Sequence, residues 1–470
     1  MRDCVRGDAG AKPALPAGTV RSSLFFVLLS AWLASAEEPA PRAMTLDEAL
    51  TYATARHPRL LAAAERLDAA NIDAQVPSAA WLPKLGAMAQ LVASTTNNST
   101  ATVLGQSAVD LPRVGATPVS PTPNFTPWVS TAIAVGVRQQ IWDFGRTASE
   151  EAAARLLRDI ESYRARGAAF DTRYAVAAAY YGVLAAASVQ SASEAALERA
   201  TQHRDYASAN VKNGLRPPIE LTRAEADVAR YEAALTRARG ALHVARTWFA
   251  ATVGVDDAEL DAAGLTEAPT VEDPELAVKH ATRAPQVLES QLRVEEQRAL
   301  TQRLEASTLP NLSATAAISA RAGGAPPSSG SSVPGYGLLP GVPNYDLGVV
   351  LTWPLLDVGV LRKAEASRAR ERALGLEAKL ALRTQEAVIR AAWNEATVAQ
   401  TALEALERGA KAAADNYDQA DHRFRVGLGT STELADAQAL RTQAEVELAI
   451  GRFQLARTRI AFERSIAEIP

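Results

Sequence analysis

Apolar residues recur every seven positions along two long stretches of the chain. The stretches 147–216 and 355–469 contain no proline and are rich in helix-favouring residues. Seven-residue spacing is typical of helices that pack as left-handed coiled coils. A helix from Thr147 to Val211 would be ~98 Å long at a rise of about 1.5 Å per residue. The rows are Leu156, Tyr163, Phe170, Ala177 and Leu184, then Leu221, Val228, Leu235, Leu242 and Phe249, and finally Leu448, Leu455 and Phe462.

A second row of small or apolar residues accompanies each of these rows at a distance of two positions. Two positions correspond to about 200° around a helix, so the two rows lie on opposite sides. Such a helix contacts two neighbours, which favours the wall of a one-layer helical tube. An ordinary antiparallel bundle is the alternative, and it usually needs one broader apolar stripe. The second rows are Ala165, Thr172, Ala179 and Ala186, then Ala226, Ala233 and Gly240, and finally Val446, Phe453 and Ile460.

Four shorter segments alternate between apolar and small or polar residues, as β-strands do. Each is about ten residues long, the length of a tilted transmembrane strand. Trp81, Trp128, Tyr345 and Trp353 lie at or near the segment ends, as in an aromatic girdle. We therefore expect one face of these strands to contact lipid, and a soluble β-sandwich is the alternative. The residues expected on the lipid face include Leu312, Ile318, Leu347, Val349 and Leu351.

The chain contains the same order of motifs twice. Trp81–Leu85 returns as Thr308–Leu312, and Asn213-Gly214-Leu215 returns as Val426-Gly427-Leu428. Asp143-Phe144-Gly145 and Asp357-Val358-Gly359 predict strand-to-helix turns, in which the aspartate caps and the glycine turns. Four strands cannot close a barrel, so the pattern predicts an oligomer. The predicted domains are a first repeat over 37–268, with strands at about 84–93 and 129–141 and long helices at about 147–212 and 218–252, and a second over 269–470, with strands at about 311–321 and 346–356 and long helices at about 360–425 and 431–468.

The N-terminal sequence predicts a secretory signal peptide. Arg21 precedes an apolar run over 24–34, and Ala34-Ser35-Ala36 has the form of a signal-peptidase site. We expect residues 1–36 to be removed, so that the mature chain starts at Glu37. The only cysteine is Cys4, which fits an oxidising compartment. No later run is expected to form a transmembrane helix, and segments 94–127 and 322–344 are expected to be flexible external loops.

Composition and motifs argue against catalysis. The net charge of −4 gives no sign of nucleic-acid binding. The five histidines do not have the spacing of metal ligands. No glycine-rich phosphate loop follows a predicted strand, and the sequence shows no Ser-His-Asp motif. We therefore predict a protein that is not an enzyme, with no cofactor and no metal site.

The ordered, duplicated motifs resemble the TolC-like outer membrane factors. Thr45–Leu50, running to His57-Pro58, resembles the opening helix of that family, and Glu275–Pro285 resembles its second copy. The two Leu-Pro motifs, the two Asp-x-Gly turns and the segment Val426–Thr430 also fit. The resemblance covers residues 45–468.

This resemblance implies a fold of mixed α and β type. It implies a homotrimer with a twelve-stranded outer-membrane β-barrel, four strands per chain, continued by a long α-helical barrel in the periplasm. The implied function is the exit duct of a tripartite efflux or type I secretion system, passing small molecules such as drugs out of the cell. The implied partners are a periplasmic adaptor, an inner-membrane pump and outer-membrane lipid. A structural coiled-coil protein of the envelope, without transport activity, is the alternative.

The resemblance also assigns two sites at the turns between the long helices. Glu433 and Asp436 match acidic positions that close family channels, and their spacing puts them on one helix face. Acidic residues in a first helical turn can instead serve only to offset the helix dipole. Gly429 stands where the family often has a basic residue. The adaptor-contacting tip is expected to comprise Val211, Gly214, Leu215, Val426, Gly427, Leu428 and Thr430.

Overall fold

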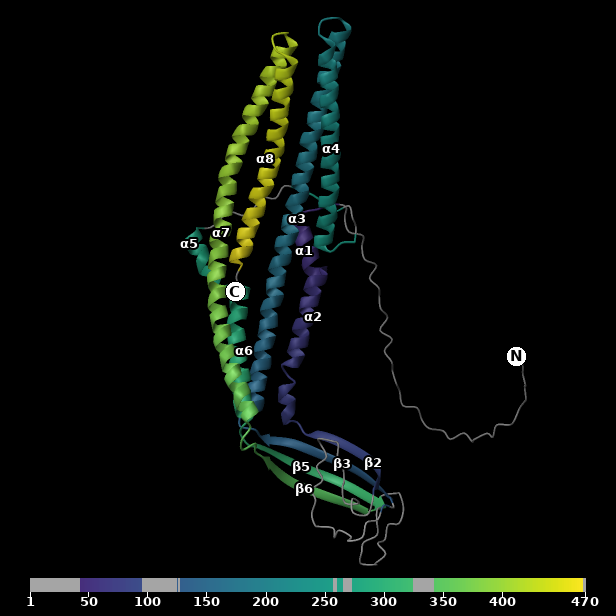
Figure 1. Cartoon of the computed structure of the whole chain (residues 1–470), viewed down its shortest axis with the longest axis vertical. Coiled ribbons are helices and arrows are strands. Elements are labelled where there is room, and N and C mark those ends of the chain that lie inside the picture. Colours follow the sequence, from purple (N-terminus) through teal and green to yellow (C-terminus); the bar gives the residue numbers. More distant parts are fainter. Residues whose placement is uncertain are drawn as a thin grey trace, which may run out of the picture. The chain divides into compact units, whose positions relative to one another are not determined.

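The computed structural model describes residues 43–94, 125, 127–256, 260–264, 273–323 and 342–467, all within one unit spanning 41–470. The expected signal peptide, and nearly all of the two expected external loops, lie outside the described residues. Helices dominate the unit (Figure 1). They are α1 (Leu46–Arg56), α2 (Pro58–Asp73), α3 (Arg146–Lys212), α4 (Pro218–Val253), α5 (Pro274–Ala277), α6 (Pro285–Ala306), α7 (Val358–Arg425) and α8 (Ser431–Ile466).

Four helices form two long hairpins. α3 has 67 residues and α7 has 68, and each is followed by a helix of 36 residues, α4 or α8. A 67-residue helix is about 100 Å long. α3 packs along α4, α7 packs along α8, and α8 also packs on α3. Each hairpin has one turn between its two helices. Both turns lie at one end of the unit, and the strands lie at the other end (Figure 1).

In α4 the first predicted row is mostly buried and the second is exposed, whereas the two predicted rows of α3 are mostly half-buried. In α4, Val228, Leu235 and Leu242 are buried, whereas the second row of Ala226, Ala233 and Gly240 is exposed in the single chain. In the half of α3 near the turns, the predicted spacing of large residues does not extend. The buried row there consists of small residues and one histidine: Ser193, Ala196, Ala200, His203 and Ala207.

A four-stranded antiparallel sheet has the order β2-β3-β5-β6, so β2 and β6 are its edges. Strand β6 ends at Thr352, whereas the alternation predicts a strand as far as 356. Pro354 explains the difference, because it has no N–H to donate to a neighbouring strand. The strands are β2 (Lys84–Ser94), β3 (Trp128–Trp142), β5 (Asn311–Gly323) and β6 (Val342–Thr352).

One face of the sheet is apolar and exposed. Val135 pairs with Ile318, which pairs with Tyr345, so the three side chains share a face. Ile318 is 64% exposed and Leu347 is 78% exposed. Leu312, predicted on this face, is half-buried. The opposite face has small residues that are buried, namely Ala132, Ala134, Ser313, Ala317 and Ser319.

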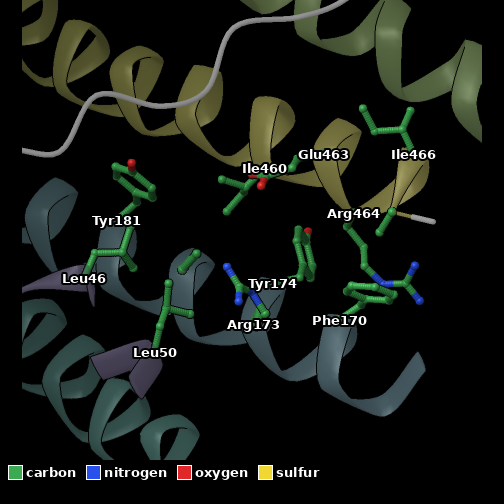
Figure 2. Close-up of a pocket in the computed structure, with 12 residues that line it drawn as sticks. Leu46, Leu50, Phe170, Arg173, Tyr174, Tyr181, Ile460, Glu463, Arg464 and Ile466 are labelled. Atoms are coloured by element: carbon green, nitrogen blue, oxygen red, sulfur yellow. The ribbon is translucent and has the colours of Figure 1, made fainter. Parts of the chain in front are cut away.

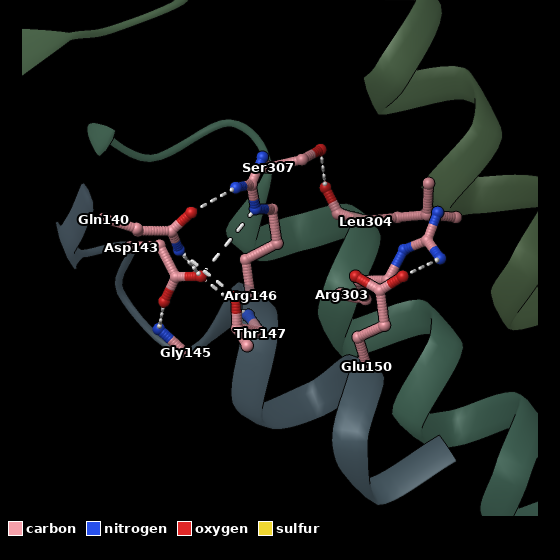
Figure 3. Close-up of polar contacts among 9 residues, drawn as sticks. All are labelled: Gln140, Asp143, Gly145, Arg146, Thr147, Glu150, Arg303, Leu304 and Ser307. Atoms are coloured by element: carbon pink, nitrogen blue, oxygen red, sulfur yellow. Dashed lines mark hydrogen bonds and ion pairs between the residues drawn. The ribbon is translucent and has the colours of Figure 1, made fainter. Parts of the chain in front are cut away.

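A buried aspartate fixes the junction between β3 and α3 (Figure 3). The Asp143 carboxylate accepts hydrogen bonds from the Thr147 backbone N–H at 2.8 Å and from the Gln140 side chain at 2.6 Å. Asp143 is 3% exposed. Gly145 has φ of +89°, a conformation that glycine adopts at little cost. Nearby, Glu150 and Arg303 form an ion pair at 3.4 Å that joins α3 to α6.

The corresponding junction before α7 is built differently. Asp357 caps the helix by accepting a hydrogen bond from the Val360 N–H at 3.0 Å, as predicted. Gly359 does not form a turn, because α7 already begins at Val358 and Gly359 lies within its first turn. The predicted capping role of Asp357 is thus confirmed, and the predicted turning role of Gly359 was wrong.

Short elements surround the middle of α3. β1 (Ala43–Met44) pairs in parallel with β4 (Asp261–Ala262), and the Tyr180 hydroxyl donates to the carbonyls of Ala263 and Gly264.

The segment predicted to copy the opening helix instead forms the four-residue α5 and a 3₁₀ helix, Val278–Arg283.

The expectation that no later run could cross a membrane as a helix needs one correction. Among the described residues, α3 is long and apolar enough to do so by length and composition alone. The many alanines of α3 give it this apolar composition, because alanine is an apolar residue.

Candidate functional site at the helical tip

The two hairpin turns close their first helices with the same backbone motif. At the end of α7, Gly427 has φ of +81°, its N–H donates to the Phe424 carbonyl at 3.1 Å, and the Leu428 N–H donates to the Arg423 carbonyl at 2.8 Å. This is the Schellman arrangement, which satisfies the last carbonyls of a helix and reverses the chain.

The end of α3 repeats this pattern. Gly214 has φ of +71° and its N–H donates to the Val211 carbonyl at 3.0 Å, while the Leu215 N–H donates to the Asn210 carbonyl at 2.9 Å. The predicted glycines therefore occupy the left-handed positions on which each turn depends. The structure places all the predicted tip residues in these two turns or within one turn of helix beside them.

Apolar side chains at the turns face solvent. Leu215 is 71% exposed and Leu428 is 75% exposed. In a Schellman motif this leucine position usually packs back against its own helix. Val426 and Ile219 are also exposed, so each turn presents an apolar surface that the chain itself does not cover.

The predicted gate residues lie at the start of α8. Thr430 and Glu433 form a capping box: the Glu433 N–H donates to Thr430 Oγ1 at 3.2 Å, and the Thr430 N–H donates to Glu433 Oε2 at 3.2 Å. Asp436 lies three residues further on and is exposed, as Glu433 is. The structure thus gives Glu433 a capping role, and it leaves the predicted gating role untested.

Gly429 lies against the end of α7. A Cβ at this position would be 3.0 Å from the Phe424 backbone N and 3.2 Å from the Arg423 backbone carbon. A side chain at this position would require the end of α7 to shift by a few tenths of an ångström.

Just below the turns, one aromatic side chain of α7 joins the two hairpins. Phe424 is 2% exposed. Its ring meets the rings of His203 and Tyr206 of α3 edge-on, with centroids 5.1 Å and 5.4 Å apart. The Arg216 guanidinium lies 5.2 Å from the same ring centroid. Residues from both hairpins therefore enclose the Phe424 ring.

Polar contacts extend this connection. Arg223 of α4 donates to Thr432 Oγ1 of α8 at 2.6 Å, and the Tyr206 hydroxyl donates to the Arg425 carbonyl at 3.4 Å. Further from the tip, Gln438 Nε2 donates to the Ala196 carbonyl at 3.0 Å. The periodicity of large apolar residues did not identify these contacts.

A signal for this connection does exist in the sequence. Phe424 is a lone large apolar residue between Arg423 and Arg425, and His203 and Tyr206 share a helix face at a spacing of three.

Burial sets the electrostatics around His203. Loss of hydration lowers the pKa of His203 below its ordinary value, and the carboxylates of Asp227, Glu220 and Asp421 oppose that shift. His203 Nε2 and Glu220 Oε2 are both buried without a hydrogen-bond partner. Among the residues that the structure describes, no group of histidine, cysteine and carboxylate side chains could hold a metal ion.

A separate cavity of about 440 Å³ lies between α1, α3 and α8 (Figure 2). Leu50, Phe170 and Ile460 give it apolar walls, and Arg173 and Glu463 also line it. None of the residues predicted for the tip or the gate lines this cavity.

Comparison with known proteins decides the family. Residues 49–255 and 276–468 match the sequence model of the outer membrane efflux protein family, and together they make up well over half of the chain. The chain belongs to this family. The resemblance to TolC-like outer membrane factors is therefore confirmed. The outer membrane efflux protein family comprises channels of the outer membrane and is not an enzyme family.

Solved channel structures share the fold. VceC of Vibrio cholerae has 18% identity and a TM-score of 0.71, over 90% of this chain and 96% of VceC. CmeC of Campylobacter jejuni has 14% identity and a TM-score of 0.72, over 90% and 85%. MtrE of Neisseria gonorrhoeae, solved in an open state, has 15% identity and a TM-score of 0.67, over 90% and 88%. No curated protein matches the chain.

Proposed function

We propose that this outer membrane efflux protein is the exit duct of a tripartite efflux or type I secretion system, and that it passes small molecules such as drugs to the exterior. The observation that carries this proposal is the sheet. One of its faces is apolar and exposed, and helices long enough to cross the periplasm follow its strands in the chain. Ile318, Leu347 and Val349 are each more than 60% exposed on that face. An apolar surface of this size calls for lipid or protein to cover it.

The sheet edges support a homotrimer. Within the described residues, β2 and β6 each pair with one strand only. In a bilayer every unpaired backbone group costs several kcal/mol, so strands there must close into a barrel. Three chains would contribute twelve strands, which is an even number within the range of outer-membrane barrels. In this assembly β6 of one chain pairs with β2 of the next.

The helices support the same assembly. The row Ala226, Ala233 and Gly240 is exposed on the side of α4 opposite α3. On the half of α7 nearer the tip, Val398 is 68% exposed. A row of small residues on one helix can accommodate a large apolar side chain of another. We infer that α4 of one chain meets α7 of the next and closes a periplasmic tunnel.

The tip provides the proposed contact with a periplasmic adaptor. Leu215, Val426 and Leu428 present an apolar surface at both turns, and an adaptor that carries an inner-membrane pump would cover it. Glu433 and Asp436 are proposed to surround the periplasmic entrance in three copies, where a ring of carboxylates would favour cations.

Three measurements test this function. The purified protein should migrate as a heat-modifiable trimer from outer-membrane fractions, and it should form ion-conducting pores in planar bilayers. Deleting its gene should increase sensitivity to drugs exported by the partner pump. A structural envelope protein, the alternative that family membership does not favour, would give neither pores nor a change in export.

A further inference from the structure

We propose that His203 is a proton-binding site, and that protonation of its imidazole weakens the docking of the α3–α4 hairpin on the α7–α8 hairpin. This inference rests on the proposed channel function, because docking of the two hairpins at the tip would set the width of the periplasmic entrance.

The position of His203 carries the first step. His203 is 9% exposed and lies on α3, where its ring contacts Phe424 of α7. Its Nε2 atom is buried and has no hydrogen-bond partner. A neutral imidazole with one ring nitrogen unpaired is tolerable in such a site, whereas an imidazolium must hydrate or pair both N–H groups. Protonation therefore favours a state in which water reaches this ring.

The second step concerns the cation of Arg216, which already lies against the Phe424 ring. The Arg216 guanidinium is held 5.2 Å from the Phe424 ring centroid, and the His203 ring lies on the same aromatic side chain. An imidazolium at His203 would add a second cation to this enclosed cluster. Two positive charges on one aromatic side chain would repel each other.

The acidic groups around the site oppose this effect without removing it. Glu220 and Asp227 face His203 from α4, and Asp421 faces it from α7. Glu220 accepts from Arg216 at 3.4 Å through Oε1, and Asp421 pairs with Arg425 at 2.9 Å. These two carboxylates are thus partly neutralised, and loss of hydration remains the larger influence on His203.

The sign of the pH dependence follows from linkage. The pKa of His203 is lower in the docked state than in a separated state, where it would return to about 6.5. Docking is therefore fully stable above the separated-state pKa, and it weakens as the pH falls from there towards the docked-state pKa. Each unit of difference between the two pKa values changes the docking equilibrium by up to about tenfold per chain.

The test measures hairpin separation directly. In the trimer of the mature chain, which is expected to have no cysteine of its own, spin labels are attached at Glu225→Cys on α4 and Gln419→Cys on α7, two exposed positions. Distances are measured in samples frozen between about pH 8 and about pH 5, the range over which histidines titrate. We expect the distance within a chain to lengthen or broaden on acidification, and bilayer conductance to rise with it.

Two variants isolate the histidine. His203→Phe keeps an aromatic ring on Phe424 but cannot take up a proton, so it should abolish the pH response. His422→Phe is the matched control, because His422 is an exposed histidine two residues from Phe424, and it should leave the response unchanged.

A pH response that survives in His203→Phe, a wild type without any response, or hairpins that move closer in acid would each overturn the proposal. Labels that respond in a trimer that conducts no ions would instead contradict the channel function and leave the proton site standing.

Discussion

At the scale of single residues, the start of α8 shows how one side chain can serve two purposes. Glu433 completes a capping box with Thr430, yet it also stands beside Asp436 on an exposed helix face. The capping box accepts either glutamate or glutamine at its third helical position. Charge and capping can therefore be changed independently of each other.

We predict that the pair Glu433→Gln and Asp436→Asn raises conductance and weakens cation preference, because six carboxylates disappear from the entrance while the capping box is kept. Thr430→Ala is the control, since it removes the cap and leaves both charges. It should cost about 1 kcal/mol of stability and leave ion selectivity unchanged. Planar-bilayer recordings and thermal unfolding distinguish the two. Unchanged selectivity in the double variant would leave Glu433 and Asp436 no gating role.

Gly427 gives a second test at this scale. Its φ of +81° lies in the left-handed region, although nothing stands within 4 Å of an added Cβ. Gly427→Ala should therefore destabilise the hairpin by about 1–2 kcal/mol through backbone strain alone. Gly409→Ala is its matched control, because Gly409 lies within α7, also in open space, and alanine there should stabilise by about 1 kcal/mol. Melting temperatures that move in the same direction would contradict this account.

At the scale of elements, strand alternation predicts the faces of the sheet. Leu347 and Asp346 are neighbours on β6 and point to opposite faces; Leu347 is exposed and Asp346 is half-buried. We predict that Leu347→Arg impairs assembly in the outer membrane, because an arginine near the bilayer midplane costs ~2–4 kcal/mol. Asp346→Arg should be tolerated better. Quantifying folded trimer in membrane fractions would check this, and equal losses would show that the faces are wrongly assigned.

Sequence reasoning succeeded where a residue pattern has one structural meaning. The predicted ranges 147–212, 218–252, 360–425 and 431–468 agree with α3, α4, α7 and α8 within two residues at each end, and the row from Val228 to Phe249 identified the buried side of α4. It failed on the buried row of α3 near the tip. Alanines occupy several faces of that helix, and burial of an alanine is decided by what packs on it rather than by its own side chain.

Tertiary contacts also limited the prediction of the site. The glycines of the tip are local, so the sequence revealed them, whereas the capping box was not predicted although its spacing is local too. The enclosure of Phe424 joins α3 and α7, whose residues lie more than two hundred positions apart in the chain. The spacing of His203 and Tyr206 indicated a shared helix face but not which ring they would meet, and Arg216 carried no local sign of that contact.

At the scale of the whole molecule, assembly should depend on faces that are open in the single chain. Ala233 lies on the exposed row of α4, and Ala241 is an exposed alanine about 80° further round the same helix. We predict that Ala233→Arg prevents formation of the heat-modifiable trimer, whereas Ala241→Arg leaves it intact. Gel electrophoresis of unheated samples gives the comparison. A trimer that survives Ala233→Arg would exclude this row from the subunit interface.

The junction at Asp143 has a mechanical consequence. α3 runs without proline from this clamp to the Schellman turn, so it acts as a lever arm about 100 Å long. For a rigid arm of this length, a change of about one degree in the angle at which α3 leaves β3 displaces the far end by almost 2 Å. The buried hydrogen bonds of Asp143 hold the pivot of that lever. Small forces on the strands would therefore move the distant tip of the hairpins.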